Sequence, residues 1–287
     1  MIRELLVSSR PLSWINTAFP FAAAYLTTTR ELDLIVIVGT VFFLIPYNLA
    51  MYGINDVFDY ESDLANPRKG GVEGALLDPS LHRTTLWAAA LTTAPFLIFL
   101  VAVGHPLSWL VLAVSMFAVY AYSAKGLRFK EKPVLDSVTS STHFVSPALY
   151  GLVLAGATFT PGLWLLLAAF FLWGIASHAF GAVQDVTADR EGGIASIATV
   201  FGAAATVRLA IATYTAAGIL LLFADWPVKL AAVLALPYIV TCLPYASVAD
   251  SDSDVANRGW KRFLTLNFVS GFIVTMLLIW WWAAHPQ

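Results

Sequence analysis

The sequence predicts an all-α integral membrane protein, built as a bundle of nine transmembrane helices. Of its 287 residues, 59% are hydrophobic and only 12% are charged, about half the charged share of a typical soluble domain. The mean hydropathy is +0.76. This composition excludes a soluble enzyme and a disordered tail, and the net charge of −2 offers no surface for nucleic acid.

The nine predicted helices correspond to nine apolar segments. Each segment is close in length to the roughly 20 residues that a helix needs to cross a bilayer. The first follows Arg10-Pro11, and each later one follows a stretch of polar residues, Gly or Pro that interrupts the hydrophobic pattern. These interruptions are, in chain order, residues 29–33, 58–83, 104–106, 123–134, 156–162, 184–205, 224–227 and 249–262. We expect helices over residues 12–28, 34–57, 84–103, 107–122, 135–155, 163–183, 206–223, 228–248 and 263–282.

The basic residues set the expected orientation. With the N-terminus in the cytoplasm, fourteen of the 16 Lys and Arg residues fall on the cytoplasmic side, where such residues gather in membrane proteins. We therefore expect a multi-pass protein of the plasma membrane with a cytoplasmic N-terminus and an external C-terminus. No removable signal peptide is expected, and residues 1–287 are expected to form a single transmembrane domain.

A run of carboxylates stands at the cytoplasmic end of the second predicted helix. Asn55 and Asp56 are followed by Asp59 and Asp63, and this spacing of three and four residues puts the carboxylates on one helix face. Like charges so close to hydrocarbon are costly unless a cation binds between them. Oxygen ligands without Cys or His indicate a hard divalent cation, Mg²⁺, shared with a phosphate group.

The same pattern returns at the end of the sixth predicted helix, where Asp185 and Asp189 lie one turn apart. Both helices run toward the cytoplasm in the nine-helix arrangement, so we expect the two clusters to face one cavity on that side. Basic residues that suit the remaining phosphate oxygens lie in the cytoplasmic loops, namely Arg68, Lys69, Lys125 and Arg128. The sequence thus predicts a metal-assisted diphosphate site that faces the cytoplasm.

The motifs Asn55-Asp56-x-x-Asp59-x-x-x-Asp63 and Asp185-x-x-x-Asp189 carry a resemblance. On the second and sixth of nine helices, they resemble the paired aspartate motifs of the UbiA superfamily of intramembrane prenyltransferases. The resemblance implies a UbiA-type fold and a Mg²⁺-dependent prenyltransferase. It also implies that the five aspartates hold two Mg²⁺ ions on a diphosphate, with Asn55 as a neutral ligand or hydrogen-bond partner.

Four stretches are similar to actinobacterial lycopene elongases within that superfamily: residues 9–17, 45–56, 66–74 and 140–144. The similarity implies transfer of dimethylallyl groups from dimethylallyl diphosphate to both ends of lycopene or another apolar isoprenoid acceptor drawn from the membrane lipid. The implied product is an acyclic fifty-carbon carotenoid of the flavuxanthin type, formed through a forty-five-carbon intermediate. One departure is that Tyr122 and Tyr120 precede Lys125 by three and five residues, whereas many family members have a Tyr four residues before the loop lysine.

Four further side chains are candidates for handling an allylic cation. Tyr52 lies four residues before Asp56, and an aromatic face over a cation contributes about 0.5 to 2 kcal/mol. Phe180 lies five residues before Asp185, although aromatic side chains in membrane helices usually serve packing or line the membrane interface. His143 and His178 lie within predicted helices and are candidate bases for the final proton, or else core histidines with hydrogen-bond partners.

Two other functions remain open from the sequence. The same chemistry on an aromatic, quinone or tetrapyrrole acceptor is one, although an aromatic acid would need a cationic pocket inside helices that carry almost no Lys or Arg. The other is a cation-coupled membrane transporter, which predicts carboxylates near the midplane at broken helices. The carboxylates of this chain instead gather at helix ends beside basic residues.

Overall fold

The computed structural model describes residues 1–64 and 76–285, without the side chains of residues 62 and 63. Within these ranges every regular element is a helix, so the predicted all-α class is confirmed. The chain divides into two compact units, Met1–Phe129 with His143–Ala157 and Lys130–Thr142 with Thr158–Gln287. Helix α8 (Leu135–Leu154) contributes its first part to the second unit and its remainder to the first.

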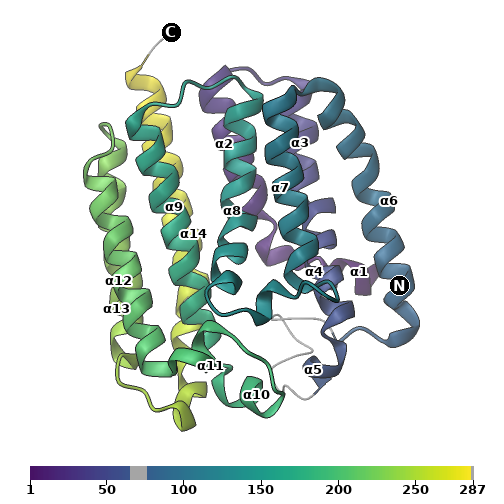
Figure 1. Ribbon diagram of the computed structural model, residues 1–287. Coiled ribbons are helices and arrows are strands. Elements are labelled where there is room, and N and C mark those ends of the chain that lie inside the picture. Colours follow the sequence, from purple (N-terminus) through teal and green to yellow (C-terminus); the bar gives the residue numbers. More distant parts are fainter. Residues whose placement is uncertain (65–75, 286–287) are drawn as a thin grey trace. The chain divides into compact units, whose positions relative to one another are not determined.

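The first unit consists of the N-terminal helices and the end of α8, and Figure 1 colours its long helices purple to teal. Its elements are α1 (Ile2–Ser8), the 3₁₀ turn η1 (Pro11–Ser13), α2 (Ile15–Thr29), α3 (Leu34–Leu44), α4 (Pro46–Phe58), α5 (Tyr60–Leu64), α6 (Pro79–Val103) and α7 (Pro106–Ser123).

Proline and side-chain caps define the starts of these helices. Asp33 accepts a hydrogen bond from Val36 N at 2.9 Å and so caps α3. Asp78 caps α6 before Pro79, and the hydrogen bonds from Ser80 lower the pKa of its exposed carboxyl. Pro46 divides the second predicted span into α3 and α4, because proline cannot donate the backbone hydrogen bond that a continuous helix needs.

An aromatic cluster fills the core of the first unit. Its rings belong to Phe21 on α2, Phe42 and Phe43 on α3, Tyr47 on α4 and Tyr150 on α8, and all five side chains are fully buried. Neighbouring ring centroids lie 4.8 to 6.0 Å apart, within the range of attractive aromatic pairs. The cluster joins α2, α3, α4 and the end of α8, and thereby fixes α4, whose far end carries the first acidic motif.

The second unit contains the remaining helices, of which α9, α12, α13 and α14 run side by side (Figure 1). Its elements after the start of α8 are α9 (Pro161–Val183), α10 (Val186–Glu191), α11 (Ile197–Phe201), α12 (Ala203–Leu222), η3 (Val228–Leu234), α13 (Ala235–Cys242), η4 (Leu243–Tyr245), η5 (Asp250–Ala256) and α14 (Asn257–Ala284). The eighth predicted span is thus partly 3₁₀ helix.

Aromatic side chains also hold this second unit together. Trp173 of α9 stacks on Phe263 of α14 at 6.0 Å, and Tyr214 of α12 stacks on Tyr238 of α13 at 5.2 Å. Tyr238 also contacts Phe263 at 5.7 Å, so that the two pairs form one core. This packing positions the end of α9, where the second acidic motif begins.

Seven helical segments of the described residues are long and apolar enough to cross a membrane. They include Leu34–Phe58, which joins α3 and α4, and Asp250–Ala284, which joins η5 and α14. Helices α2 and α8 coincide with the first and fifth predicted spans, but α2 has 15 residues and α8 carries a run of Ser and Thr. The multi-pass membrane architecture is therefore confirmed, and the count of nine stays a prediction.

Substituting Gly39 tests the aromatic cluster. A Cβ at this position of α3 would overlap the buried ring of Phe21. We predict that Gly39→Ala lowers the free energy of unfolding by about 1 to 3 kcal/mol through overpacking. In α14 a Cβ at Gly271 meets no atom within 4 Å, and Gly271→Ala should raise stability by about 0.5 to 1 kcal/mol. Thermal melting in detergent measures both changes, and equal melting temperatures for the two variants would contradict this packing.

Candidate active site

The first acidic motif lies where α4 ends. Asn55 and Asp56 stand in the last turn of this helix, and Asp59 is its C-terminal cap, donating its backbone N–H to Asn55 O at 2.9 Å. Asp56 is 1% exposed and Asp59 is 4% exposed. Two buried carboxylates three residues apart require positive partners, because an unpaired buried charge is costly.

Arg10 is the positive partner of Asp56. Its Nη2 donates to Asp56 Oδ1 at 2.7 Å, and Ser8 Oγ donates to Asp56 Oδ2 at 2.8 Å. Arg10 has a φ of 51°, which turns the chain sharply between α1 and η1. Its guanidinium also covers the ring of Tyr52 at 4.4 Å from the centroid. One face of this candidate cation-stabilising ring therefore already carries a cation.

The loop after α7 supplies the partner of Asp59. Arg128 Nη2 lies 3.5 Å from Asp59 Oδ1, and Arg128 Nη1 donates to Phe58 O at 3.3 Å. Ser123 Oγ, at the end of α7, donates to Asn55 Oδ1 at 2.9 Å. Arg128 thus reaches the first motif, whereas Lys125 is exposed and forms no hydrogen bond or ion pair within the described residues.

The second motif begins where α9 ends. Asp185 is the N-terminal cap of α10, and Asp189 lies one turn later, its N–H donating to Asp185 O at 2.8 Å. Both side chains are partly buried. The preceding Gln184 is held by Asn257 of α14, whose Nδ2 donates to Gln184 Oε1 at 2.6 Å. The two carboxylates therefore stand one helical turn apart on a fixed helix end.

Arg190, which follows the second motif, has structural partners. Its Nη1 donates to Asp250 Oδ2 at 2.6 Å, and its Nη2 donates to Thr199 O at 2.8 Å. Asp250 Oδ1 also accepts a hydrogen bond from Ala203 N, the first residue of α12. Arg190 thus ties α10 to η5 and to the segment before α12.

A buried polar chain connects α8, α9 and α11 in the second unit. Asp136 is fully buried, its Oδ2 accepts from Ile197 N at 2.7 Å, and its Oδ1 accepts from Ser137 N at 2.6 Å. Ser137 Oγ lies 3.0 Å from Nδ1 of His178, which stands on α9 two turns before Asp185. Ser137 and Asp136 therefore orient the imidazole of His178.

The other predicted residues have simpler surroundings. His143 is 3% exposed, and the ring of Tyr122 meets it edge-on at 5.3 Å. Phe180 is buried in the core of the second unit. Arg68 and Lys69 lie outside the described residues, as does the side chain of Asp63.

Arg10 and Ser8 are the site residues that sequence reasoning missed. The signal was present, because Arg10 is the one base directly before the first apolar segment, in Arg10-Pro11. A charge at that position is usually explained as a topology determinant. Arg10 and Asp56 are 46 residues apart in the sequence, and the folded chain brings them into contact.

The side chains of the two motifs offer the type of ligand atom that a divalent cation such as Mg²⁺ binds. These atoms are carboxylate and amide oxygens, the ligands that Mg²⁺ prefers. Within the described residues, no three His, Cys, Asp or Glu side chains are grouped closely enough to hold a metal ion. Mg²⁺ usually keeps water or phosphate oxygens among its ligands beside one or two carboxylates.

Comparison with known proteins decides the family. The sequence profile of the UbiA prenyltransferase family matches residues 17–269, most of the chain. The chain belongs to the UbiA prenyltransferase family. A lycopene elongase/hydratase of Corynebacterium glutamicum is 52% identical to this UbiA-family chain over 278 residues, which cover 97% of each protein.

A C(50) beta-cyclic carotenoids biosynthesis protein of Dietzia sp. is 59% identical over 281 residues, or 98% of this chain. The chain spans 65% of the length of that relative. Among solved structures, a UbiA homologue from Archaeoglobus fulgidus bound to DMAPP and Mg²⁺ matches with a TM-score of 0.66 and 20% identity, covering 94% of this chain and 99% of that one. This likeness confirms the UbiA-type fold.

Replacing Arg10 tests the buried ion pair. We predict that Arg10→Gln lowers the free energy of unfolding by about 3 kcal/mol, because it leaves the carboxylate of Asp56 buried without its cation. The loss should be much smaller in the Asp56→Asn background, so that a double-mutant cycle measured by thermal melting gives a coupling energy. Arg3→Gln, which removes an exposed charge from α1, is the control. Equal losses from Arg10→Gln in both backgrounds would refute the pairing.

Proposed function

We propose that this protein is a Mg²⁺-dependent lycopene elongase that transfers dimethylallyl groups from dimethylallyl diphosphate to both ends of lycopene. The product would be an acyclic fifty-carbon carotenoid of the flavuxanthin type, formed through a forty-five-carbon intermediate. The observation that carries the proposal is the 52% identity, over nearly the full length of both proteins, to a lycopene elongase/hydratase. The buried carboxylates of α4 and the oxygen-only donor set agree with the chemistry.

The two acidic motifs would hold the diphosphate. Asp56, Asp59, Asp185 and Asp189, with Asp63, are the proposed ligands of Mg²⁺, and Asn55 is a neutral ligand or hydrogen-bond partner. When bound, Mg²⁺ neutralises the charge that builds up on the leaving diphosphate. Arg128 is already at the first motif, 3.5 Å from Asp59, and its guanidinium would bind a phosphate oxygen there. Lys125, Arg68 and Lys69 are proposed to complete the neutralisation.

The reaction itself needs an apolar environment. As the allylic C–O bond breaks, a dimethylallyl cation develops, and the terminal alkene of the acceptor attacks it. Each transfer thus forms one C–C bond and releases one diphosphate, and the resulting tertiary cation then loses a proton or takes up water. The helices exclude water from these cations, which otherwise react with it. Tyr52 is the proposed aromatic side chain near the reacting carbon, whereas Phe180, the other candidate, is packed in the core of the second unit.

His178 is the proposed base for that proton, with His143 as the second candidate. Ser137 Oγ lies 3.0 Å from Nδ1 of His178, and the other ring nitrogen, Nε2, is proposed to take the proton. Ser137 Oγ also donates to Asp136 Oδ1 at 3.2 Å, so the buried carboxylate lies next to the serine that contacts the imidazole. His143 is also buried, and its ring meets that of Tyr122 edge-on.

The proposal also covers the location and the orientation of the enzyme in the membrane. The chain would lie in the plasma membrane as one prenyltransferase domain with its N-terminus in the cytoplasm, its C-terminus outside and its active site on the cytoplasmic side. The uneven distribution of Lys and Arg supports this orientation. It places the diphosphate motifs where water-soluble dimethylallyl diphosphate is made, while lycopene arrives through the lipid.

Expression in a bacterium that makes lycopene tests the activity. We predict pigments of forty-five and fifty carbons by mass spectrometry, and at least about a 100-fold loss with Asp59→Asn or Asp185→Asn, because these carboxylates stabilise the charge of the transition state. Asp254→Asn removes an exposed carboxylate of η5 and should leave the yield unchanged. A forty-carbon pigment alone, with the protein present in the membrane, would refute the elongase proposal.

A second experiment separates the base from the diphosphate site. We predict that His178→Gln lowers kcat with lycopene about 100-fold and leaves KM for dimethylallyl diphosphate within about twofold, since the base acts after the diphosphate has left. His143→Gln measures the second candidate under the same conditions. An unchanged kcat for His178→Gln would remove this residue from the mechanism.

A further inference from the structure

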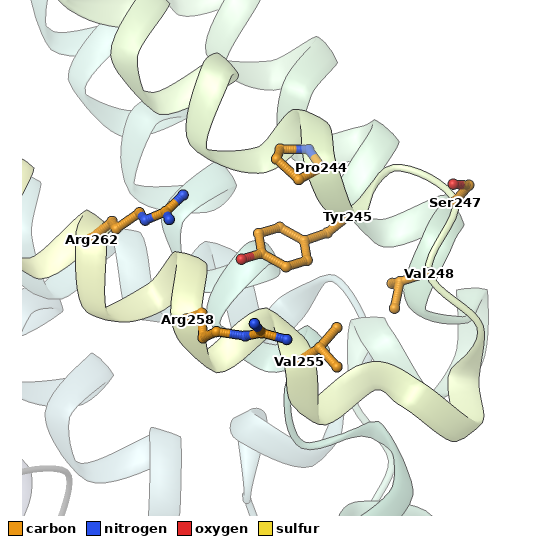
Figure 2. A pocket seen from close by; sticks show the side chains of 7 residues that line it. All are labelled: Pro244, Tyr245, Ser247, Val248, Val255, Arg258 and Arg262. Atoms are coloured by element: carbon orange, nitrogen blue, oxygen red, sulfur yellow. The ribbon is translucent and has the colours of Figure 1, made fainter.

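The second unit contains a cavity that the proposed reaction does not use. It has a volume of about 420 Å³ and lies between η4, with the loop that follows it, and the start of α14 (Figure 2). One part of its wall is apolar and is formed by Pro244, Val248 and Val255. The other part is polar and carries two arginines, a tyrosine and a serine.

The two arginines stand one turn apart on α14. Arg258 and Arg262 are both exposed, and spacing of four residues puts them on the same side of the helix. Neither forms a hydrogen bond or an ion pair anywhere in residues 1–64 and 76–285. Two guanidinium groups with unused donors are thus available to one anion.

Tyr245 is held firmly at the wall opposite these arginines. Its ring packs on Phe180 with centroids 5.9 Å apart, and a Cβ at Gly259 of α14 would lie 2.6 Å from its Cε2 atom. Figure 2 shows its hydroxyl directed toward the helix that carries Arg258 and Arg262. Since the side chain is only 9% exposed, its hydroxyl has a fixed direction before any ligand arrives.

Hydrogen bonds also fix both walls of the cavity. Arg208 of α12 donates from Nε to Ala246 O at 2.8 Å and so secures the loop after η4. Asn257 holds the start of α14 through its hydrogen bond to Gln184. The cavity is therefore preorganised, and a ligand would lose little binding energy to ordering of the backbone.

We propose that this cavity binds a phosphate group, with Arg258 and Arg262 on its oxygens and Tyr245 as a further donor. Guanidinium pairs bind phosphate with several charge-assisted hydrogen bonds. Basic pockets at the ends of membrane helices bind anionic headgroups, and the apolar wall formed by Pro244, Val248 and Val255 suits the first carbons of a lipid chain. The phosphate comes from a membrane phospholipid or from solution, and the experiment below distinguishes the two.

The experiment titrates the purified protein in a neutral detergent and follows its thermal melting. The probes are dioleoylphosphatidylglycerol, dioleoylphosphatidylcholine and inorganic phosphate, each added to the original protein and to three single variants. Arg262→Gln removes one charge that lines the cavity, and Lys261→Gln removes an exposed charge from the adjacent position of α14. Tyr245→Phe removes only the hydroxyl.

We predict that phosphatidylglycerol stabilises the original protein in a saturable way. Arg262→Gln should weaken its apparent affinity about tenfold, as expected for the loss of one charge-assisted hydrogen bond, and Lys261→Gln by less than about twofold. Tyr245→Phe should cause a loss of a few fold. If inorganic phosphate competes with the lipid, the phosphate group alone is recognised; if it does not, the ligand is the phospholipid.

Equal losses in Arg262→Gln and Lys261→Gln would overturn the proposal, because they would indicate general attraction to a basic surface. No saturable effect of any probe would do the same, as would stabilisation by phosphatidylcholine that Arg262→Gln leaves unchanged. Each variant is compared with its own melting temperature without lipid. A change in intrinsic stability is therefore separated from a change in binding.

Discussion

The structure depends on the pairing of buried acidic side chains with cations inside an apolar protein. Asp56 and Asp59 lie at the end of α4, in surroundings where an isolated carboxylate would be protonated or would destabilise the fold. Arg10 and Arg128 supply the opposite charges from the chain before α2 and from the loop after α7. These two ion pairs tie the N-terminal segment and that loop to the end of α4. Both arginines have a positive φ.

In the second unit, carboxylates also need donors, and here backbone N–H groups supply them. The buried Asp136 accepts from the N–H of Ile197 at the start of α11, and the more exposed Asp250, which also pairs with Arg190, accepts from the N–H of Ala203 at the start of α12. Helix starts offer such unsatisfied N–H groups and carry a partial positive charge, so a carboxylate placed there is stabilised. Asp185 and Asp189 are partly exposed at a helix end, where a metal ion could reach their carboxylates.

Hydrophobic patterning was sufficient to predict the fold class, because membrane-spanning helices must satisfy their backbone hydrogen bonds internally. It predicted the positions of the long helices and placed the two acidic motifs at helix ends. The pattern of charges alone indicated Arg128. Hydrophobic patterning missed the break at Pro46, the 3₁₀ segment η3 and the short helices α10 and α11, which depend on local backbone geometry. Hydrophobic patterning also could not predict the role of Arg10, because its contact with Asp56 joins positions far apart in the chain. The pairing of Asp136 with Ile197 is hidden from the sequence for the same reason.

The most direct test compares the amount of diphosphate released with the number of prenyl groups transferred, in a membrane of defined composition. The purified protein would be placed in lipid nanodiscs with lycopene, deuterated dimethylallyl diphosphate and Mg²⁺, and the pigment mass and the released diphosphate would be measured together. We predict one diphosphate for each deuterated five-carbon unit gained, up to two units per lycopene, and loss of both signals when a chelator removes the metal. Diphosphate release without any gain in pigment mass, or pigment elongation that continues in the chelator, would contradict this prediction.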